Sequence, residues 1–471
     1  MRTTSLRIAT AFTALLIVSG PVAAQQAPPA AENPEVTAPA EDPKPAKKDE
    51  KKTEEETTDV KILKERPISM QHFRAVDRRG INVFETPKEP GVEYTGFKMD
   101  WNAAFTSQVQ SLSHSNTAAP VMTNGVNGNQ LADIGFGFNN STANLYLNAQ
   151  LGKGIRVALT SYLSARHHNE TWVKDGYLLV DASPIDIKPL NRLMEFVTLR
   201  VGHFEINYGD AHFRRSDNGN AIYNPFVGNL IMDGFTTEIG GEAYLRHKGV
   251  IAMASVTGGE LRGTVLTPGQ RGPTLIGKLG FDRQVKPNLR VRLTGSMYRA
   301  DKSMSNTLYG GDRAGSRYYY VLENTAATES AQFTSGNINP GFKNSVTAMQ
   351  VNPFVKFGGL EVFGVIERAE GKTLAEATDR RFTQQAVDVV YRALGDNVYI
   401  GTRYNRVNGR LAGFTDDVQA NRWQFGTGLF LTSGLLVKVE YVNQEFKGYP
   451  VTSIRNGGKF KGMMFEGVVA F

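Results

Sequence analysis

The last thirteen residues of the chain, Lys459–Phe471, read KFKGMMFEGVVAF and carry the strongest indication of its fold. Such a period of two in apolar residues is typical of a β-strand with one apolar face. An ordinary edge strand of a soluble sheet would show the same alternation. A closed β-barrel accounts better for a strand at this place, because its last strand pairs with its first and leaves no open edge. Phe471 is therefore expected to take part in barrel closure. The apolar row behind it consists of Val469, Gly467, Phe465 and Met463.

Segments of about ten residues with alternating polarity follow one another from Gly96 onward, and a strand of this length crosses a bilayer at a tilt. Leu145–Leu151 and Leu289–Thr294 show the alternation most clearly. The pattern predicts an all-β fold, a transmembrane antiparallel β-barrel of about 16 strands. The candidate strands lie near residues 97–110, 141–151, 155–166, 171–182, 195–204, 237–247, 250–258, 274–284, 288–300, 347–357, 360–368, 383–393, 397–407, 421–432, 435–446 and 459–471.

The connections between these strands alternate between short and long. Turns bearing Gly, Pro or Asn join every second pair of strands, for example at 358–359 and 432–434. Residues 182–195 break this rule, since they form a long connection where a short turn is due. Short turns at one end and long loops at the other are typical of bacterial outer-membrane barrels. The long connections are expected near 111–140, 205–236, 259–273, 301–346, 369–382, 408–420 and 447–458.

The N-terminal part of the chain differs in composition from the barrel. Its first residues combine Arg2 and Arg7 with a short apolar stretch and end in small residues at Ala24, which predicts a signal peptide cleaved after Ala24. A stretch rich in Pro, Ala, Lys and Glu follows and is too polar to fold alone. The predicted location is the bacterial outer membrane. The predicted divisions are signal peptide 1–24, disordered charged periplasmic linker 25–66, periplasmic lead-in 67–94 and barrel 95–471.

The predicted barrel is mildly cationic. The chain carries +7, to which residues 1–24 contribute +2 and residues 25–66 contribute −3, so residues 67–471 carry +8. Charged residues recur on the inward rows of the strands, which predicts a water-filled lumen that favours anions. The alternative for each charge is a structural ion pair. The predicted pore-lining residues are Arg156, Arg200, Lys278, Arg290, Arg292, Lys356, Arg403 and Lys438.

The connection 205–236 is unusually rich in aromatic and apolar residues for an exposed loop. It must pack on something, and the barrel interior is the expected surface. We therefore predict that it folds inward and narrows the lumen, with His212, Arg214, Arg215 and Asp217 at the constriction. The alternative for the two arginines is structural pairing with nearby acids.

The segment Leu199–Gly209, LRVGHFEINYG, is similar to a strand-and-turn pattern of the phosphate-selective porin O and P family, in which a G-x-F strand end leads to a further Gly. The order of segments from signal peptide to terminal Phe also resembles that of a porin. This resemblance implies a trimeric anion channel with an arginine-lined pore and lysines at the constriction. The connection 205–236 departs from that pattern, since it holds Arg214 and Arg215 and no run of lysines.

Catalytic interpretations have weaker support. His203, His212, Asp210 and Ser216 are close enough in sequence for a triad to be imagined, but such neighbours arise by chance in a polar loop. His167 and His168 lack a spaced third metal ligand, and Cys is absent from the chain. We therefore predict no enzymatic activity, no catalytic residue, no metal, no cofactor and no binding of nucleic acid.

The sequence thus predicts a porin for passive diffusion of small hydrophilic solutes, with a preference for anions that could include phosphate-like anions. The expected partners are outer-membrane lipid, small anionic or neutral solutes and, from the resemblance, further copies of the chain in a homotrimer. The alternative is a plugged structural or adhesive barrel that binds partners through its outer loops or its N-terminal tail. Detectable conductance separates these two hypotheses.

Overall fold

The computed structural model describes residues 73–85, 94–164, 170–261, 263, 265–310 and 317–471, without the side chain of Glu170. All of them belong to one compact unit, Ile62–Phe471. The predicted signal peptide and linker lie outside the described residues, as do His167, His168 and part of the predicted lead-in.

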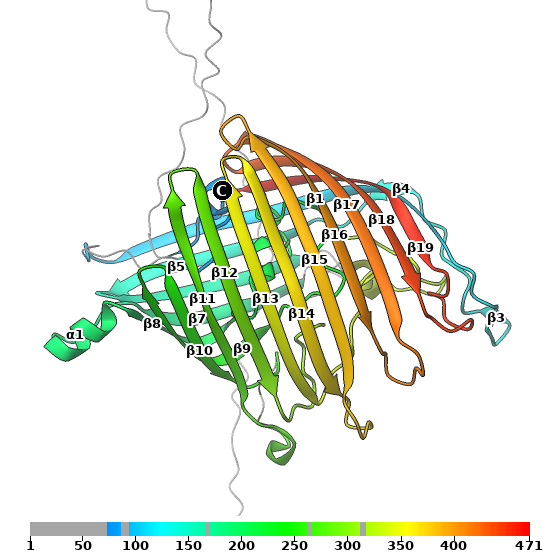
Figure 1. Cartoon of the computed structure of the whole chain (residues 1–471), viewed down its shortest axis with the longest axis horizontal. Coiled ribbons are helices and arrows are strands. Elements are labelled where there is room, and N and C mark those ends of the chain that lie inside the picture. The colour runs from blue at the N-terminus through cyan, green and yellow to red at the C-terminus, as the bar shows by residue number, and fades with distance from the viewer. Residues whose placement is uncertain (1–72, 86–93, 165–169, 262, 264, 311–316) are drawn as a thin grey trace, which may run out of the picture. The chain divides into compact units, whose positions relative to one another are not determined.

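Sixteen antiparallel strands in this part of the chain close into a barrel (Figure 1), which confirms the predicted fold class. From β5 to β19 each strand pairs with its neighbours in sequence, and β1 closes the barrel by pairing with both β5 and β19. Every predicted strand corresponds to one of them. The strands are β1 Lys98–Ser115, β5 Thr142–Gly152, β6 Ile155–Ser164, β7 Glu170–Val180, β8 Val197–Glu205, β9 Thr237–His247, β10 Val250–Thr257, β11 Thr274–Lys286, β12 Leu289–Ala300, β13 Ser345–Phe357, β14 Leu360–Lys372, β15 Arg380–Ala393, β16 Val398–Gly409, β17 Val418–Thr432, β18 Leu435–Lys447 and β19 Lys459–Ala470.

Closure extends to the last residue. The amide of Phe471 donates to the carbonyl oxygen of Ala103 at 2.9 Å, and the amide of Ala103 donates back at 2.7 Å. The Phe471 side chain itself is exposed. The last strand therefore has a paired edge, as a closed barrel requires.

The remaining elements are short. The strand β4, Phe136–Phe138, pairs with β1, and β2, Met122–Thr123, pairs with β3, Val126–Asn127. The long connection at 182–195 contains the helix α1, Lys188–Met194. No helix among the described residues is both long and apolar enough to span a membrane. Single turns of 3-10 helix lie at Arg78–Gly80, Ala211–Arg214, Pro268–Gln270 and Glu329–Phe333.

Burial alternates along the strands because successive side chains point to opposite faces of the sheet. In β15 the alternation is unbroken from Arg380 to Arg392. Its outward row includes Val387, Val389 and Tyr391, which are all exposed. The apolar outward residues of β15 thus lie toward the turn 394–397, whereas Arg381, Thr383 and Gln385 form the other half of the outward row. The inward row mixes polar and apolar residues.

The two ends of the barrel differ in their connections. Turns such as Gly358-Gly359 and Ser433-Gly434 lie at one end, which we call the short-turn end (Figure 1). The opposite, long-loop end carries connections such as 301–344 between β12 and β13. Two of these connections, 206–236 between β8 and β9 and 301–344 between β12 and β13, turn back into the barrel. We call residues 206–236 the inner loop.

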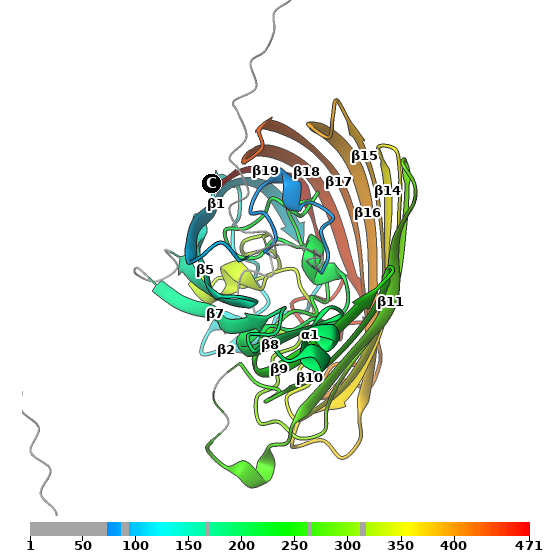
Figure 2. The ribbon, with the colours of Figure 1, turned by 90° about the vertical axis from the view of Figure 1, so that its left-hand side faces the viewer.

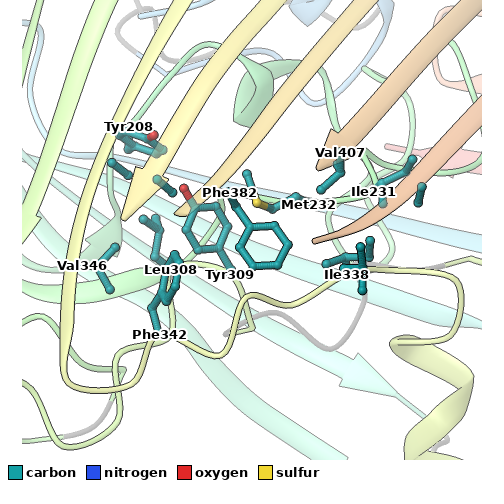
Figure 3. Close-up of a cluster of buried hydrophobic side chains, with 14 of the residues drawn as sticks. Tyr208, Ile231, Met232, Leu308, Tyr309, Ile338, Phe342, Val346, Phe382 and Val407 are labelled. Carbon is teal, nitrogen blue, oxygen red and sulfur yellow. The ribbon is translucent and has the colours of Figure 1, made fainter. Parts of the chain in front are cut away.

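The interior holds three clusters of buried hydrophobic side chains. The largest gathers near the long-loop end, where Ile231 and Met232 of the inner loop meet Leu308 and Phe342 of the connection 301–344 and Phe382 of β15 (Figure 3). Figure 2 shows these connections running inside the ring of strands. The interior therefore differs from the predicted water-filled lumen narrowed by the connection 205–236 alone, because further protein fills much of its cross-section.

Polar side chains on the inward rows hold the backbone of the inner loop. Glu440 of β18 accepts from the amide of Val227 at 2.8 Å, and Asn405 of β16 accepts from the amide of Ile231 at 2.7 Å. Lys438 donates to the carbonyl oxygen of Ala221 at 2.9 Å. A loop buried in this way needs such partners, because its backbone groups cannot reach water.

Gly219 marks the closest approach of the inner loop to the wall. A Cβ atom there would lie 2.3 Å from Cα of Ala143 and 2.6 Å from the carbonyl oxygen of Ala104. Both are backbone atoms of paired strands, so they cannot move aside. Gly219→Ala is expected to lower the free energy of unfolding by about 1–3 kcal/mol through overpacking, measured by denaturant unfolding. Gly467→Ala, where an added Cβ meets no atom within 4 Å, is the matched control. Equal losses in the two variants would contradict the close approach.

Candidate pore and its lining

A cavity of about 250 Å³ lies between the inner loop and the wall formed by β5 to β9. We call it the β5–β9 cavity. The strand residues that line it lie in the half of the barrel nearer the short-turn end, such as Asn148 of β5 and Arg246 of β9. Residues of the inner loop and of the described segment 73–85 line its other side. The cavity is thus the part of the interior that the three hydrophobic clusters leave open beside this wall.

A β-bulge in β7 places two adjacent charges inside the barrel. Thr160 of β6 pairs with Asp175 and the next residue, Ser161, pairs with Val173, so Lys174 is an extra residue in β7. Such a bulge interrupts the alternation and re-aims a side chain. Lys174 and Asp175 therefore both line the cavity. Strict alternation would have sent one of them outward, so Lys174 is not among the pore-lining residues that the sequence predicts.

Lys174 bridges the space between the wall and the inner loop. Its Nζ lies 2.9 Å from Oε2 of Glu205 at the end of β8, and it also forms an ion pair with Asp217 of the inner loop. Tyr162 of β6 donates to the same Asp217. Arg215 pairs with Asp217 at 3.3 Å. These side chains form a polar cluster where strand and loop come together, and we call these five residues the Lys174 cluster.

The charges around the cavity are balanced. Its lining includes five basic side chains besides His212, and five acidic ones. Some of their polar atoms lack a hydrogen-bond partner among the described residues, including Nε of Arg200, Nε of Arg246 and Oδ1 of Asp175. Water or a polar solute can satisfy such atoms. The basic residues are Arg74, Lys174, Arg200, Arg215 and Arg246, and the acidic residues are Glu85, Asp175, Asp181, Glu205 and Asp217.

Three of the four residues predicted at the constriction line the cavity, namely His212, Arg215 and Asp217. Arg214 points elsewhere, because its guanidinium lies over the rings of Phe354 and Phe363 and 3.5 Å from Glu361. The side chains of Arg214 and Arg215 thus point to different sides of the inner loop. Contact of any of these residues with a solute stays a prediction.

The eight predicted pore-lining cations all point into the barrel, but only Arg200 lines the β5–β9 cavity. Arg290 and Lys356 border a recess of about 600 Å³ at the short-turn end. The other five are buried and hold acids or backbone carbonyls. Arg403, for example, forms an ion pair with Asp388 at 2.6 Å and donates to Gly228 at 3.1 Å. The five buried residues are Arg156, Lys278, Arg292, Arg403 and Lys438.

Asp210 of the inner loop contacts two of these buried cations, Lys278 and Arg292. It is 0% exposed and accepts from both Nε and Nη2 of Arg292 at 2.8 Å. Lys278 lies 2.7 Å from the same carboxylate. Burial opposes ionisation of Asp210, but Lys278 and Arg292 outweigh it and hold the pKa of this carboxyl below its usual value. The inner loop is therefore attached to β11 and β12 through a buried carboxylate.

The residues considered for catalysis have separate partners. His203 bonds to the hydroxyl of Thr237 at 2.8 Å, and Ser216 donates to the carbonyl oxygen of Val227 at 3.4 Å. Asp210 is occupied by the two cations of β11 and β12. His212 bonds to Glu205 at 2.5 Å through Nδ1 and to Asn207 at 3.0 Å through Nε2, so these contacts bring neither Ser216 nor Asp210 to an imidazole. The described part of the chain also holds no group of three or more His, Asp or Glu side chains placed to bind a metal.

Several solved structures of outer-membrane proteins are similar to this chain. The anion-selective porin from Comamonas acidovorans covers 80% of this chain and 100% of its own length, with 12% identity and a TM-score of 0.50. The chain has the fold of that porin. OprB of Pseudomonas putida, with 11% identity over 79% of this chain and 94% of its own, has a TM-score of 0.48. The channel DcaP of Acinetobacter baumannii, with 10% identity over 80% of this chain and 99% of its own, has a TM-score of 0.46.

No family model matches the chain, and no curated protein matches it. The resemblance of Leu199–Gly209 to the phosphate-selective porin O and P family therefore stays a prediction. The comparisons show the barrel fold alone, because one fold can serve different functions.

Proposed function

We propose that the chain is a bacterial outer-membrane porin through which small polar solutes diffuse. The passage runs through the β5–β9 cavity and past the Lys174 cluster. The observation that carries this proposal is the cavity itself, which is lined by charged and hydroxyl-bearing side chains inside a closed barrel. A closed barrel with many exposed apolar side chains on its outer surface fits a membrane, because each of its sixteen strands pairs with a neighbouring strand on both sides.

Local charge is the main determinant of which ions pass, because charges beyond about 8 Å are largely screened at physiological salt. The net charge of +8 on residues 67–471 favours anions, in line with the anion selectivity of the Comamonas porin. The cavity lining, however, carries five cations and five acids besides His212. We therefore propose a weak preference for anions, with neutral and zwitterionic solutes also passing. Phosphate-like anions remain candidates among the solutes.

A plugged structural barrel is the second candidate function, and the three hydrophobic clusters inside the barrel favour it. The inner loop and the connection 301–344 together occupy much of the interior. In this case the β5–β9 cavity would be a closed internal space. A flux measurement separates the two candidates.

The test is flux through the full-length protein in liposomes and planar bilayers. We expect stable single-channel conductance, and liposome swelling in small sugars and amino acids. A reversal potential in a KCl gradient should show a small preference for chloride. A complete absence of both conductance and swelling would contradict the porin and favour the plugged barrel.

We also propose a homotrimer, as the resemblance to porins implies. The expected result is a trimer mass for the detergent-solubilised protein by native mass spectrometry. A purely monomeric protein in mild detergent would contradict this assembly, while leaving the passage within one barrel unaffected.

A further inference from the structure

Residues 73–85, which we call the N-terminal segment, lie inside the barrel at the short-turn end (blue in Figure 2). The amide of Arg78 donates to the carbonyl oxygen of Ser433, in the turn between β17 and β18, at 2.8 Å. Its guanidinium donates to Gly395, in the turn between β15 and β16, at 3.1 Å. Further along, the side-chain amide of Asn82 donates to the carboxylate of Glu361 in β14 at 2.6 Å. The segment therefore crosses the interior beside the short turns.

The far end of the N-terminal segment is buried among charges and rings. Phe84 is 2% exposed, and its ring packs at 5.3 Å against the ring of Phe354. The Arg292 guanidinium lies 4.2 Å from the centre of the Phe84 ring. Glu85 forms ion pairs with Arg292 at 2.8 Å and with Lys278 at 3.2 Å. These contacts define a site that recognises a phenyl ring followed by a carboxylate.

Arg74 attaches the near end of the segment to the inner loop. Its guanidinium lies 3.5 Å from the centre of the Tyr223 ring, within the range of a cation–π contact. It also donates to the carbonyl oxygen of Phe213 at 2.9 Å. Arg74, Phe84 and Glu85 all line the β5–β9 cavity. The N-terminal segment thus forms one side of the proposed passage and narrows it.

The barrel keeps its charges paired without this segment. Lys278 has a second carboxylate in Asp210 at 2.7 Å, and Arg292 binds the same Asp210 at 2.8 Å. Glu361, which accepts a hydrogen bond from the side-chain amide of Asn82, also pairs with Arg392 at 2.8 Å. Losing the only partner of a buried charge is strongly destabilising. The departure of the segment therefore leaves each of these three buried charges with a partner of opposite sign.

The N-terminal segment pairs with none of the described strands. Its one regular element is the 3-10 turn Arg78–Gly80, and Asp77 caps this turn by accepting from the amide of Arg79 at 2.9 Å. Side-chain contacts and single hydrogen bonds hold it, in contrast to the continuous ladders of the barrel. Its release therefore breaks no strand ladder, and parts of a fold can open locally in this way without global unfolding.

We propose that the short-turn end of the barrel contains a binding site for this chain's own residues 73–85, and that this segment is a removable plug. The ligand class is a peptide with one tight turn that offers an arginine, a phenylalanine and a carboxylate. When the segment leaves, the β5–β9 cavity widens and conductance rises. This inference rests on the proposed porin function, since a plug has an effect only where a passage exists.

Gly80→Ala tests the plug without changing any barrel residue. A Cβ atom at Gly80 would lie 2.1 Å from the carbonyl oxygen of Ala75 and 2.6 Å from Cε1 of Tyr223. The segment therefore cannot keep its present turn against Tyr223. We expect a several-fold rise in single-channel conductance of the full-length variant. Gly295→Ala on β12 is the matched control, because an added Cβ there meets no atom within 4 Å.

A disulfide provides the opposite test. The chain contains no Cys, so Arg78→Cys combined with Ser433→Cys places one reactive pair where the two backbones are joined by a hydrogen bond of 2.8 Å. Oxidation should form the crosslink, seen as a shift on a denaturing gel, and hold conductance at its lowest level. Reduction should break the crosslink and return the conductance to its value before oxidation.

Each outcome decides a different point. Failure of the crosslink to form would overturn the binding site. A crosslink that forms, together with Gly80→Ala conductance equal to that of the unchanged protein, would overturn the plug while leaving the porin in place. A crosslink that forms in a protein that never conducts, reduced or with Gly80→Ala, would overturn the porin and the plug with it.

Discussion

Asp210→Ala is expected to lower the free energy of unfolding by about 1.5–3 kcal/mol, because it removes a buried carboxylate from Lys278 and Arg292, which keep only Glu85 and Asp282 as acidic partners within 4 Å among the described residues. Asp210 is 0% exposed and contacts both Lys278 and Arg292 within 2.8 Å. Its pKa is held below the usual value by these cations. The stabilisation is therefore fully present at neutral pH and is lost only as the pH falls through that lowered pKa. Denaturant unfolding followed by Trp fluorescence measures the change.

Asp301→Ala is the matched control for Asp210→Ala. Asp301 also pairs with an arginine, Arg299, at 2.9 Å, but its side chain is 69% exposed. An exposed pair contributes about 0–1 kcal/mol. Similar losses in the two variants would contradict the attachment of the inner loop through Asp210.

Lys174→Gln is expected to shift the permeability of the channel toward cations. Lys174 is 7% exposed and is the cation that joins Glu205 and Asp217 across the proposed constriction. A unit charge at about 4 Å changes the energy of an ion by about 1 kcal/mol in water, or about fivefold in a permeability ratio. Removing this cation leaves both acids facing the passage. The reversal potential in a KCl gradient should therefore shift in the direction that indicates a higher permeability of K⁺ relative to chloride.

Lys153→Gln is the matched control for this shift, since Lys153 lies exposed in the turn between β5 and β6 and outside the cavity lining. We expect little change in the reversal potential of Lys153→Gln. An unchanged reversal potential in Lys174→Gln would contradict the constriction at the Lys174 cluster.

Pairing between strands could be predicted from the sequence because alternation in a strand repeats every second residue over a long segment. The outward rows, such as Val387, Val389 and Tyr391, signal an apolar environment directly. Closure through the last strand also followed, since Lys459–Phe471 is a strand that must find a partner. The structure confirms all sixteen predicted strands.

The filling of the interior could not be predicted from alternation. An inward Lys or Arg has the same sequence pattern whether it faces water or a loop carbonyl, as Lys438 does with Ala221. The inward course of 205–236 was suggested by its aromatic content, but its register inside the barrel was not. Arg214 and Arg215 therefore seemed equivalent, while the structure places only Arg215 on the cavity. Lys174 was missed because a bulge breaks the alternation, although two adjacent charges in a strand are a signal for one.

Thiol accessibility measures the position of the passage most directly, because the chain has no Cys of its own. Asn148→Cys places a thiol on β5 in the lining of the β5–β9 cavity, whereas Gln384→Cys places one on β15, where Gln384 donates to the carbonyl oxygen of Met232 in the inner loop at 2.7 Å. A charged thiol reagent should reduce the current through Asn148→Cys and leave Gln384→Cys unchanged. A current that falls only in Gln384→Cys, or in neither variant, would contradict a passage between the inner loop and the β5–β9 wall.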